Sequence, residues 1–392
     1  MGDKAHKKNS PENDLVKSYL KALHKEIELV NDVEPLSTLY IGGGTPSILE
    51  IDEISSLLEH IEKKFCFQPG IEITIEIDPA SFNFSYLTNL LTLGINRFSL
   101  GGQSFDNETL RKIGRRHNQT NLINSCAWLD ELLKKKQIKS WSLDLIQNLP
   151  DSKLHFWEEQ INQAINCNPP HLSIYDLTIE PGTKFFYRNK YGKLHLPDDD
   201  CAADINRLTS AMLENVGYAR YEISNYAKPG FTSRHNRVYW SGSGWWAFGM
   251  GSTSSPWGIR FSRPKQIDKY IDWVDQQSEK GNHFSLLKKN QKPIPFDDQI
   301  IVGIRRREGV NLDQLADNSG WPEIYRKKYL ERLMERWKVF FDSGILKMEG
   351  NRAKLKNPEG MDICNQVLVE MFIWWDELPK EIFDLSNPSN DL

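Results

Sequence analysis

One short segment places a histidine among aromatic side chains, in a pattern suited to binding a metal-bearing ring. The hexad reads His235-Asn236-Arg237-Val238-Tyr239-Trp240, and the Gly/Trp-rich run Trp245–Gly251 follows it. Histidine is a natural axial ligand of haem iron, and Tyr and Trp faces can pack against a porphyrin. A lone histidine is more often a structural group. Because a histidine ligand and aromatic packing surfaces are both available in this one short segment, we favour haem contact.

A second segment combines glycines with the end of a strand. Leu36–Ile41 predicts a strand, and Gly42-Gly43-Gly44-Thr45-Pro46-Ser47 follows it directly. Glycines let the backbone pass close to a ligand, and exposed N–H and carbonyl groups can bind the charged amino-acid end of a cofactor. A tight turn between strand and helix is the alternative interpretation. Polar residues at the ends of later strands favour the ligand site: Glu76, Gln103 and Asp144.

The cysteines predict no metal site. The chain has five, with no closely spaced triplet: Cys66, Cys126, Cys167, Cys201 and Cys364. A [4Fe–4S] cluster is held by clustered cysteine thiolates, which this spacing does not supply. An odd, scattered set of cysteines fits a reducing compartment better than a disulfide framework, so we predict a cytoplasmic protein.

The elements that must position these residues alternate between helix and strand up to about residue 180. Helical spacing is found at Tyr19–Leu29 and in the segments 51–65, 87–93, 122–133 and 156–165, and strands are predicted at 36–41, 71–77, 95–100, 138–146 and 171–177. This alternation predicts an α/β fold, a partial (βα) barrel with its ligand residues at the carboxyl ends of the strands. The chain enters the pattern at a helix, so we expect the first barrel strand to be missing and a parallel edge to be exposed.

Periodicity and composition divide the chain into four parts. These are a partial barrel (1–182), a middle region with the hexad (183–287), a small winged-helix-like domain (296–376) and a tail (377–392). Lys288–Pro295, with two prolines, is the predicted linker. In the winged-helix-like domain, a helical stripe from Leu330 to Phe341 precedes a hairpin over 345–356.

Taken together, the blocks resemble radical S-adenosylmethionine (SAM) proteins related to oxygen-independent coproporphyrinogen III oxidase, and within that group the HemW haem-chaperone branch. The resemblance extends over about residues 13 to 375. It implies that SAM is contacted by Gly44, Thr45, Glu76, Gln103, Arg115 and Asp144. It also implies that haem is bound by His235, Asn236, Tyr239 and Trp240. Taken singly, Arg115 could equally be a surface cation and Glu76 a salt-bridge partner.

The sequence departs from the family in three places. Ile77-Asp78 follows Glu76 where the family often has a small residue and Asn, and Gln147-Asn148 replaces a common Tyr-Gly. The third departure is larger, since the family holds a [4Fe–4S] cluster on a C-x3-C-x2-C loop after the first barrel strand. Both the strand and the loop are missing ahead of the first helix, near Asp14. We expect either a truncation or a late-assigned translation start, with a cluster-free paralogue as the alternative.

The predicted function is that of a haem chaperone, which binds haem and passes it to an unidentified acceptor protein. The alternative is an enzyme, an oxygen-independent coproporphyrinogen III oxidase, and the hexad favours the chaperone. Without cluster thiolates we expect no 5′-deoxyadenosyl chemistry and only weak SAM binding. The net charge of −4 and the absence of a long apolar run predict neither nucleic acid nor a membrane as partner.

Overall fold

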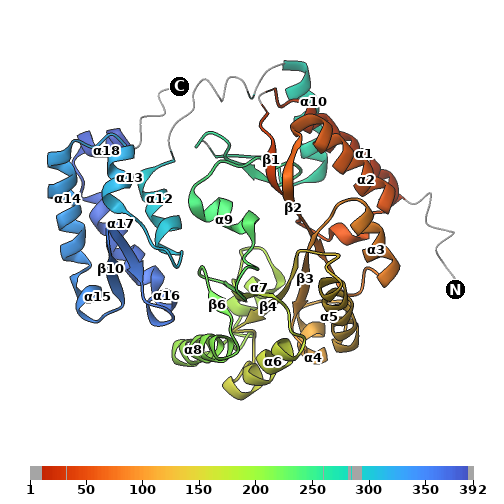
Figure 1. The fold of residues 1–392 in the computed structure, drawn as a ribbon, viewed down its shortest axis with the longest axis horizontal. Helices are drawn as coiled ribbons and strands as arrows, with labels where there is room; N and C mark the ends of the chain where they lie inside the picture. The colour runs from red at the N-terminus through yellow and green to blue at the C-terminus, as the bar shows by residue number, and fades with distance from the viewer. Residues whose placement is uncertain (1–10, 32, 259, 281–283, 285–293, 387–392) are drawn as a thin grey trace.

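A seven-stranded sheet forms the centre of the molecule (Figure 1). We describe it in a computed structural model, which covers residues 11–386 apart from 32, 259, 281–283 and 285–293. In sheet order the strands are β1 (Leu36–Ile41), β2 (Phe67–Ile77), β3 (Arg97–Gln103), β4 (Ser140–Gln147), β5 (His171–Asp176), β7 (Asn225–Ala227) and β6 (Ala219–Arg220). The first five are parallel, and β7 runs antiparallel to both β5 and β6. The predicted α/β partial barrel is confirmed.

The two faces of the sheet differ in polarity because side chains alternate along each strand. On β2, Ile71, Ile73, Ile75 and Ile77 join the main apolar core, whereas Glu72, Thr74 and Glu76 occupy the alternate positions. Helices cover the apolar face: α2 (Ile51–Phe65), α3 (Phe84–Thr92), α5 (Gln119–Lys134), α6 (Leu154–Asn166) and α8 (Asp199–Asn215). The short elements η1 (Pro46–Ile48), α4 (Asn107–Lys112) and α7 (Lys184–Lys190) lie in the connections.

The edge strand β1 is contacted by a helix from the middle of the chain. All six residues of β1 are only partly buried, and helix α9 (Arg234–Ser241) packs against the strand. The carboxylate of Glu72 accepts hydrogen bonds from the backbone N–H groups of Arg234 (3.3 Å) and His235 (3.0 Å). A carboxylate is favourable at a helix N-terminus because it satisfies free N–H groups and complements the helix dipole. Glu72 therefore anchors α9 on the polar face of the sheet.

A buried ion pair joins α1 (Pro11–Glu28) to the segment that follows α9. Nε of Arg263 donates to Glu26 at 2.6 Å, and both side chains are fully buried. Glu26 also accepts from the hydroxyl of Tyr270, in α10 (Ile267–Lys280), at 2.6 Å and from the backbone N–H of Gly249 at 2.9 Å. The small ribbon β8 (Thr253–Ser254) and β9 (Phe261–Ser262) lies in the same segment. One carboxylate thus holds three parts of the chain together.

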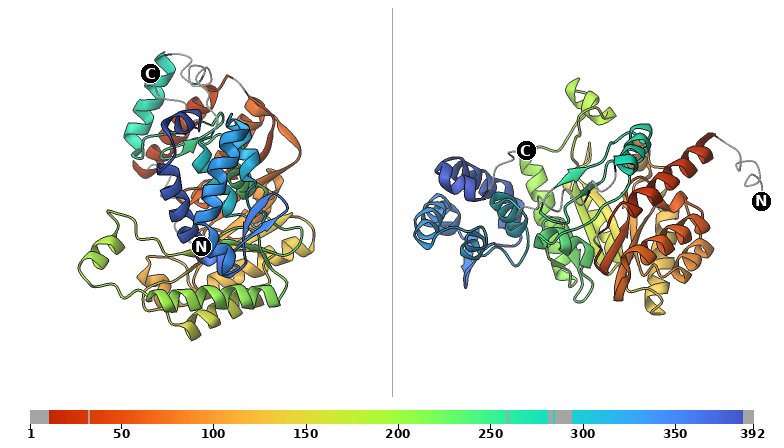
Figure 2. Two further views of the ribbon diagram at one scale, coloured as in Figure 1. Left: turned by 90° about the vertical axis from the view of Figure 1, so that its left-hand side faces the viewer. Right: turned by 90° about the horizontal axis from the view of Figure 1, so that it is seen from above.

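The C-terminal residues form a body with its own core beside the sheet (Figure 2). Its elements are α12 (Phe296–Ile304), α13 (Leu312–Asn318), α14 (Glu323–Arg336), α15 (Lys338–Asp342), β10 (Leu346–Glu349), β11 (Arg352–Leu355), α16 (Glu359–Asp362), α17 (Cys364–Asp376) and α18 (Lys380–Ser386). It contacts the sheet through an ion pair between Arg220 and Asp362 at 2.7 Å. No helix of the described residues is long and apolar enough to cross a membrane.

Two details of the C-terminal body differ from the sequence prediction. The helical stripe over 330–341 is divided at Trp337, between α14 and α15, and the fully buried Trp337 indole donates to the carbonyl of Val367. Within the predicted tail, residues 380–386 form α18, where Ile382 is buried. Most of the predicted linker 288–295 and the end of the tail, 387–392, lie outside the described residues.

Candidate functional site

The glycine turn after β1 is bound by a carboxylate from the next strand. Oε2 of Glu76 accepts from the backbone N–H of Gly43 at 3.1 Å, and Oε1 accepts from the hydroxyl of Tyr40 at 2.9 Å. Gly42 lies so close to both side chains that an added Cβ would be 2.5 Å from the Tyr40 ring and 2.8 Å from Glu76. Gly43 has φ +113°, which side chains rarely adopt. These two glycines are therefore required by the turn itself.

The third glycine of the turn, Gly44, is accessible to a ligand. Gly44 is exposed, and no atom lies within 4 Å of the place where its Cβ would be. Thr45 follows as the residue that precedes η1 and is partly buried. Backbone groups at Gly44 are therefore accessible to a ligand. Contact with the methionine end of SAM stays a prediction.

Asp144 lies on β4, on the same polar face as Glu76. Its Oδ2 accepts from the hydroxyl of Ser99, on the neighbouring strand β3, at 2.6 Å. Its Oδ1 is buried and has no hydrogen-bond partner among the described residues. A buried acceptor without a donor is costly. Asp144 thus offers one unused acceptor to a ligand hydroxyl.

Burial raises the pKa of both carboxylates. For Asp144, burial outweighs the lowering effect of the nearby hydroxyls of Ser99, Ser173 and Ser142. For Glu76, burial outweighs the hydrogen bonds from Tyr40 and Gly43, and the nearby charge of Asp144 adds to the rise. Two buried carboxylates of like charge gain from a positively charged group placed between them. The ammonium of an amino acid is such a group.

Gln103 and Arg115 lie at the same edge of the sheet but contact other groups. Gln103 is the last residue of β3 and has φ +61°. The Arg115 guanidinium lies 3.7 Å from Asp78, two residues beyond Glu76, and His117 lies at the same distance from that carboxylate. Burial would raise the pKa of Asp78, but His117, the N–H of Ala80 and Arg115 together hold it below its usual value. Arg115 thus pairs with an ionised Asp78 in this structure.

The hexad forms helix α9, and His235 faces β1. Nδ1 of His235 is 2.9 Å from the hydroxyl of Thr38, and Nε2 is 3.1 Å from the hydroxyl of Tyr239 one turn later. The imidazole stacks on Tyr40 with 5.1 Å between ring centroids, and Tyr239 packs edge-on against Trp245 at 5.0 Å. Burial lowers the pKa of His235 to about 4. The imidazole is therefore neutral at pH 7, as a metal-binding histidine must be.

The other predicted haem residues lie on different faces of α9. Asn236 contacts Tyr221 through its side chain, and Trp240 lines a cavity that Tyr239 does not line. In the aromatic run after the hexad, Trp246 and Phe248 pack in a cluster with α1 and α2. His235, Tyr239 and Trp245 are thus the residues of this region that share one surface.

Tyr40 connects the two groups of predicted residues. Its ring stacks on His235, and its hydroxyl donates to Glu76. The sequence analysis missed Tyr40, and it missed Thr38 and Asp78 as well. Thr38 and Tyr40 are two residues apart on β1, so they share a face, and this spacing of two was the available signal.

The described cysteines do not fit an iron–sulfur cluster. All five are free thiols, and two of them, Cys126 and Cys364, are buried; Cys126 and Cys167 interact with each other. Among the described residues no group of three His, Cys, Asp or Glu side chains could hold a metal ion. We therefore derive no chemical step from a cluster.

Comparison with known proteins places the chain in a family. Residues 11–146 match the radical SAM superfamily. The haem chaperone HemW of Synechocystis is 32% identical over 378 residues, which cover 92% of this chain and 89% of the relative. HemW of Haemophilus influenzae is 36% identical over 335 residues, 83% of each chain. The chain belongs to the HemW family. The predicted family is thus confirmed.

The fold is shared with a structurally characterised radical SAM enzyme. Coproporphyrinogen III oxidase (HemN) from Escherichia coli superposes with a TM-score of 0.72 at 20% sequence identity, covering 92% of this chain and 84% of the enzyme. At that identity the similarity concerns the fold alone. The HemW relatives are named as haem chaperones and HemN as an oxidase, so the shared fold does not by itself identify a function.

Proposed function

We propose that this protein is a haem chaperone, which binds haem through His235 and transfers it to an acceptor protein. The observation that carries the proposal is the state of His235: a neutral imidazole on α9, stacked on Tyr40 and adjacent to Tyr239. A neutral imidazole is an axial ligand of haem iron. The HemW relatives, all named as haem chaperones, support this assignment.

The surroundings of His235 suit a ligand that binds reversibly. Among the described residues, Nε2 is hydrogen-bonded to the Tyr239 hydroxyl alone, and Tyr239 itself is 38% exposed. Iron coordination at Nε2 would replace the solvent-accessible hydrogen bond to Tyr239 with a bond to the metal. Thr38 at Nδ1 keeps the ring oriented meanwhile, as a second hydrogen bond does for many metal-bound histidines.

We also propose that the turn after β1 and the two carboxylates bind SAM. Gly44 and Thr45 supply backbone groups, Glu76 accepts from the ammonium, and the free Oδ1 of Asp144 accepts from a ribose hydroxyl. Gln103 and Arg115 border the same edge. SAM bound here would place a positively charged ammonium beside the two carboxylates. In the family, a [4Fe–4S] cluster would supply the electron for reductive cleavage of SAM. The cysteines of this chain do not provide such a cluster.

Haem titration of the purified protein, followed by absorbance, tests the proposal. The wild type should bind one haem per chain, and His235→Ala should bind more weakly with a changed spectrum. His155→Ala, at an exposed position of α6, is the matched control and should bind like the wild type. Identical spectra for the wild type and His235→Ala would remove His235 as the ligand.

A further inference from the structure

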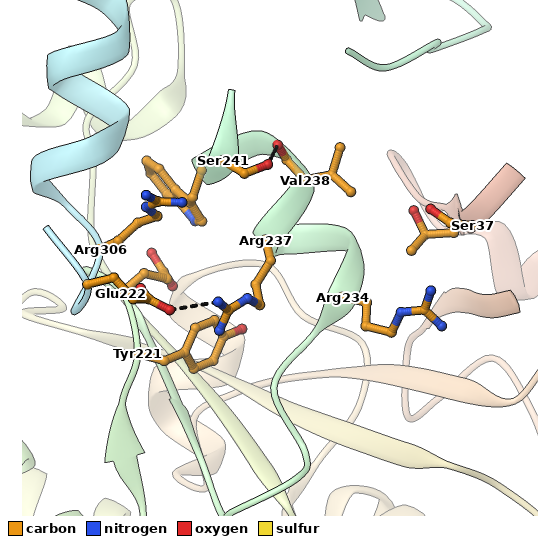
Figure 3. A pocket seen from close by; sticks show the side chains of 11 residues that line it. Ser37, Tyr221, Glu222, Arg234, Arg237, Val238, Ser241 and Arg306 are labelled. Carbon is orange, nitrogen blue, oxygen red and sulfur yellow. Dashed lines mark hydrogen bonds and ion pairs between the residues drawn. The ribbon is translucent and has the colours of Figure 1, made fainter. Parts of the chain in front are cut away.

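Two adjoining cavities lie between α9, the end of the sheet and the C-terminal body. One has a volume of about 320 Å³ and is lined by α9 together with β1 and Arg306 (Figure 3). The other, of about 510 Å³, extends to the β10–β11 hairpin and Arg352. Both are lined by Tyr221, Arg237 and Glu308. We refer to the two cavities together as the basic groove.

The groove concentrates positive charge on a protein that is acidic overall. Seven Lys and Arg side chains line it, against three glutamates, whereas the whole chain has a net charge of −4. A concave surface lined mainly by one sign of charge attracts ligands of the other sign. The groove is therefore suited to an anion.

The arginines at its centre are not fully neutralised. Arg237 forms an ion pair with Glu308 at 2.6 Å, whereas Arg352 donates to the backbone carbonyls of Glu308 (2.8 Å) and Gly309 (2.6 Å). Nε of Arg306 is buried and has no hydrogen-bond partner among the described residues. Burial lowers the pKa of Arg306; Glu308 opposes this, and Arg352 and Arg237 lower it further. Of the three guanidinium groups, only that of Arg237 forms an ion pair with a carboxylate among the described residues.

The groove lies next to the proposed haem ligand. Thr38 lines the smaller cavity and is hydrogen-bonded to His235. Arg234, Val238 and Ser241 face this cavity from α9, at the three- and four-residue spacing of one helical face. Trp240 and Val238 add apolar surface to the lining. One helix therefore presents an iron ligand, apolar side chains and arginines.

We propose that the basic groove binds the carboxylates of the porphyrin, the two propionate groups at one edge of haem. The proposal rests on the haem-binding function proposed above. The planar guanidinium fork matches a carboxylate with two parallel hydrogen bonds. A porphyrin carboxylate between Arg306 and Arg352 satisfies the free Nε and balances the shared charge.

The test compares haem with haem dimethyl ester, in which both propionates are neutral. Titrations use the wild type, Arg306→Gln and a control, Arg207→Gln, which removes one exposed arginine from α8. The wild type should bind haem more tightly than the ester. Arg306→Gln should weaken haem binding by about tenfold, the effect of one lost charge-assisted hydrogen bond, and should leave ester binding unchanged. Arg207→Gln should alter neither.

Unchanged ester binding also shows that Arg306→Gln is folded. Equal affinity of the wild type for haem and ester, with both still dependent on His235, would overturn the groove proposal and leave the proposed function standing. Failure to bind either compound would overturn the proposed function itself. Inorganic phosphate is the competing anion: if it binds to the groove and Arg306→Gln removes phosphate without weakening haem, the porphyrin assignment is wrong.

Discussion

Acidification should weaken the folded state through His235. Its pKa is about 4 in the folded protein, against an ordinary value of 6.5. Between these values the unfolded chain binds the proton and the folded chain does not. The contribution of His235 is therefore fully present above pH 6.5 and is lost as the pH falls toward 4. From the two values the loss is about 2 kcal/mol at pH 5 and about 3 kcal/mol below pH 4.

Urea unfolding of the wild type and His235→Gln, at pH 7.5 and pH 5.0, measures this contribution. Glutamine does not titrate, so the stability difference between the two proteins isolates the His235 proton from all other groups. The wild type should lose about 2 kcal/mol relative to the variant between the two pH values. His155→Gln, at the exposed position on α6, controls for loss of an imidazole from the unfolded chain.

The reasoning is refuted if the wild type and His235→Gln lose stability in parallel. NMR titration of the imidazole gives an independent result, since a midpoint near 6.5 would show that His235 is accessible to water. In that case the imidazole would be largely protonated at pH 5, and iron ligation would have to compete with that proton.

Three further predictions follow from side chains described above. Glu26→Gln should destabilise the protein by about 3–5 kcal/mol in urea unfolding, because it leaves Arg263 buried without its partner charge; a loss below about 1 kcal/mol would contradict this. Tyr40→Phe should raise the pKa of Glu76 further, since the hydroxyl hydrogen bond lowers it, and carbon NMR of the carboxyl group should detect the shift; an unchanged pKa would show that the bond is not made in solution. Anaerobic iron–sulfur reconstitution of this chain should yield no stable cluster, because among the described residues no three thiols lie together; a [4Fe–4S] spectrum would refute that.

The repeating part of the fold could be predicted because its signals are local. The bounds of β1 and α2 match the predicted segments 36–41 and 51–65. In α2 the apolar stripe has helical spacing, and a capping box at Glu50 and Glu53 fixes its start. The strands β6 and β7 were missed, since two or three residues are too few to show a period.

The site was harder to predict because it depends on pairing across distant segments. The hexad marks His235, but the sequence contains no sign that Thr38 and Tyr40 contact it almost two hundred positions away. The basic groove was also missed, since Arg237, Arg306 and Arg352 belong to three segments that meet only in the folded chain. Motifs indicate single residues, whereas the charge of a cavity depends on tertiary structure.

The contact of Tyr40 with both His235 and Glu76 has a thermodynamic consequence. A ligand that breaks the hydrogen bond between Glu76 and the Tyr40 hydroxyl frees the Tyr40 ring to move, and His235 stacks on that ring. A ligand at His235 can in turn shift the same ring and so alter its hydrogen bond to Glu76. Binding free energies coupled in this way are reciprocal, so each ligand must change the affinity for the other by the same factor. A measured change in haem affinity when the carboxylate site is filled would therefore also give the change in affinity at the carboxylate site when haem binds.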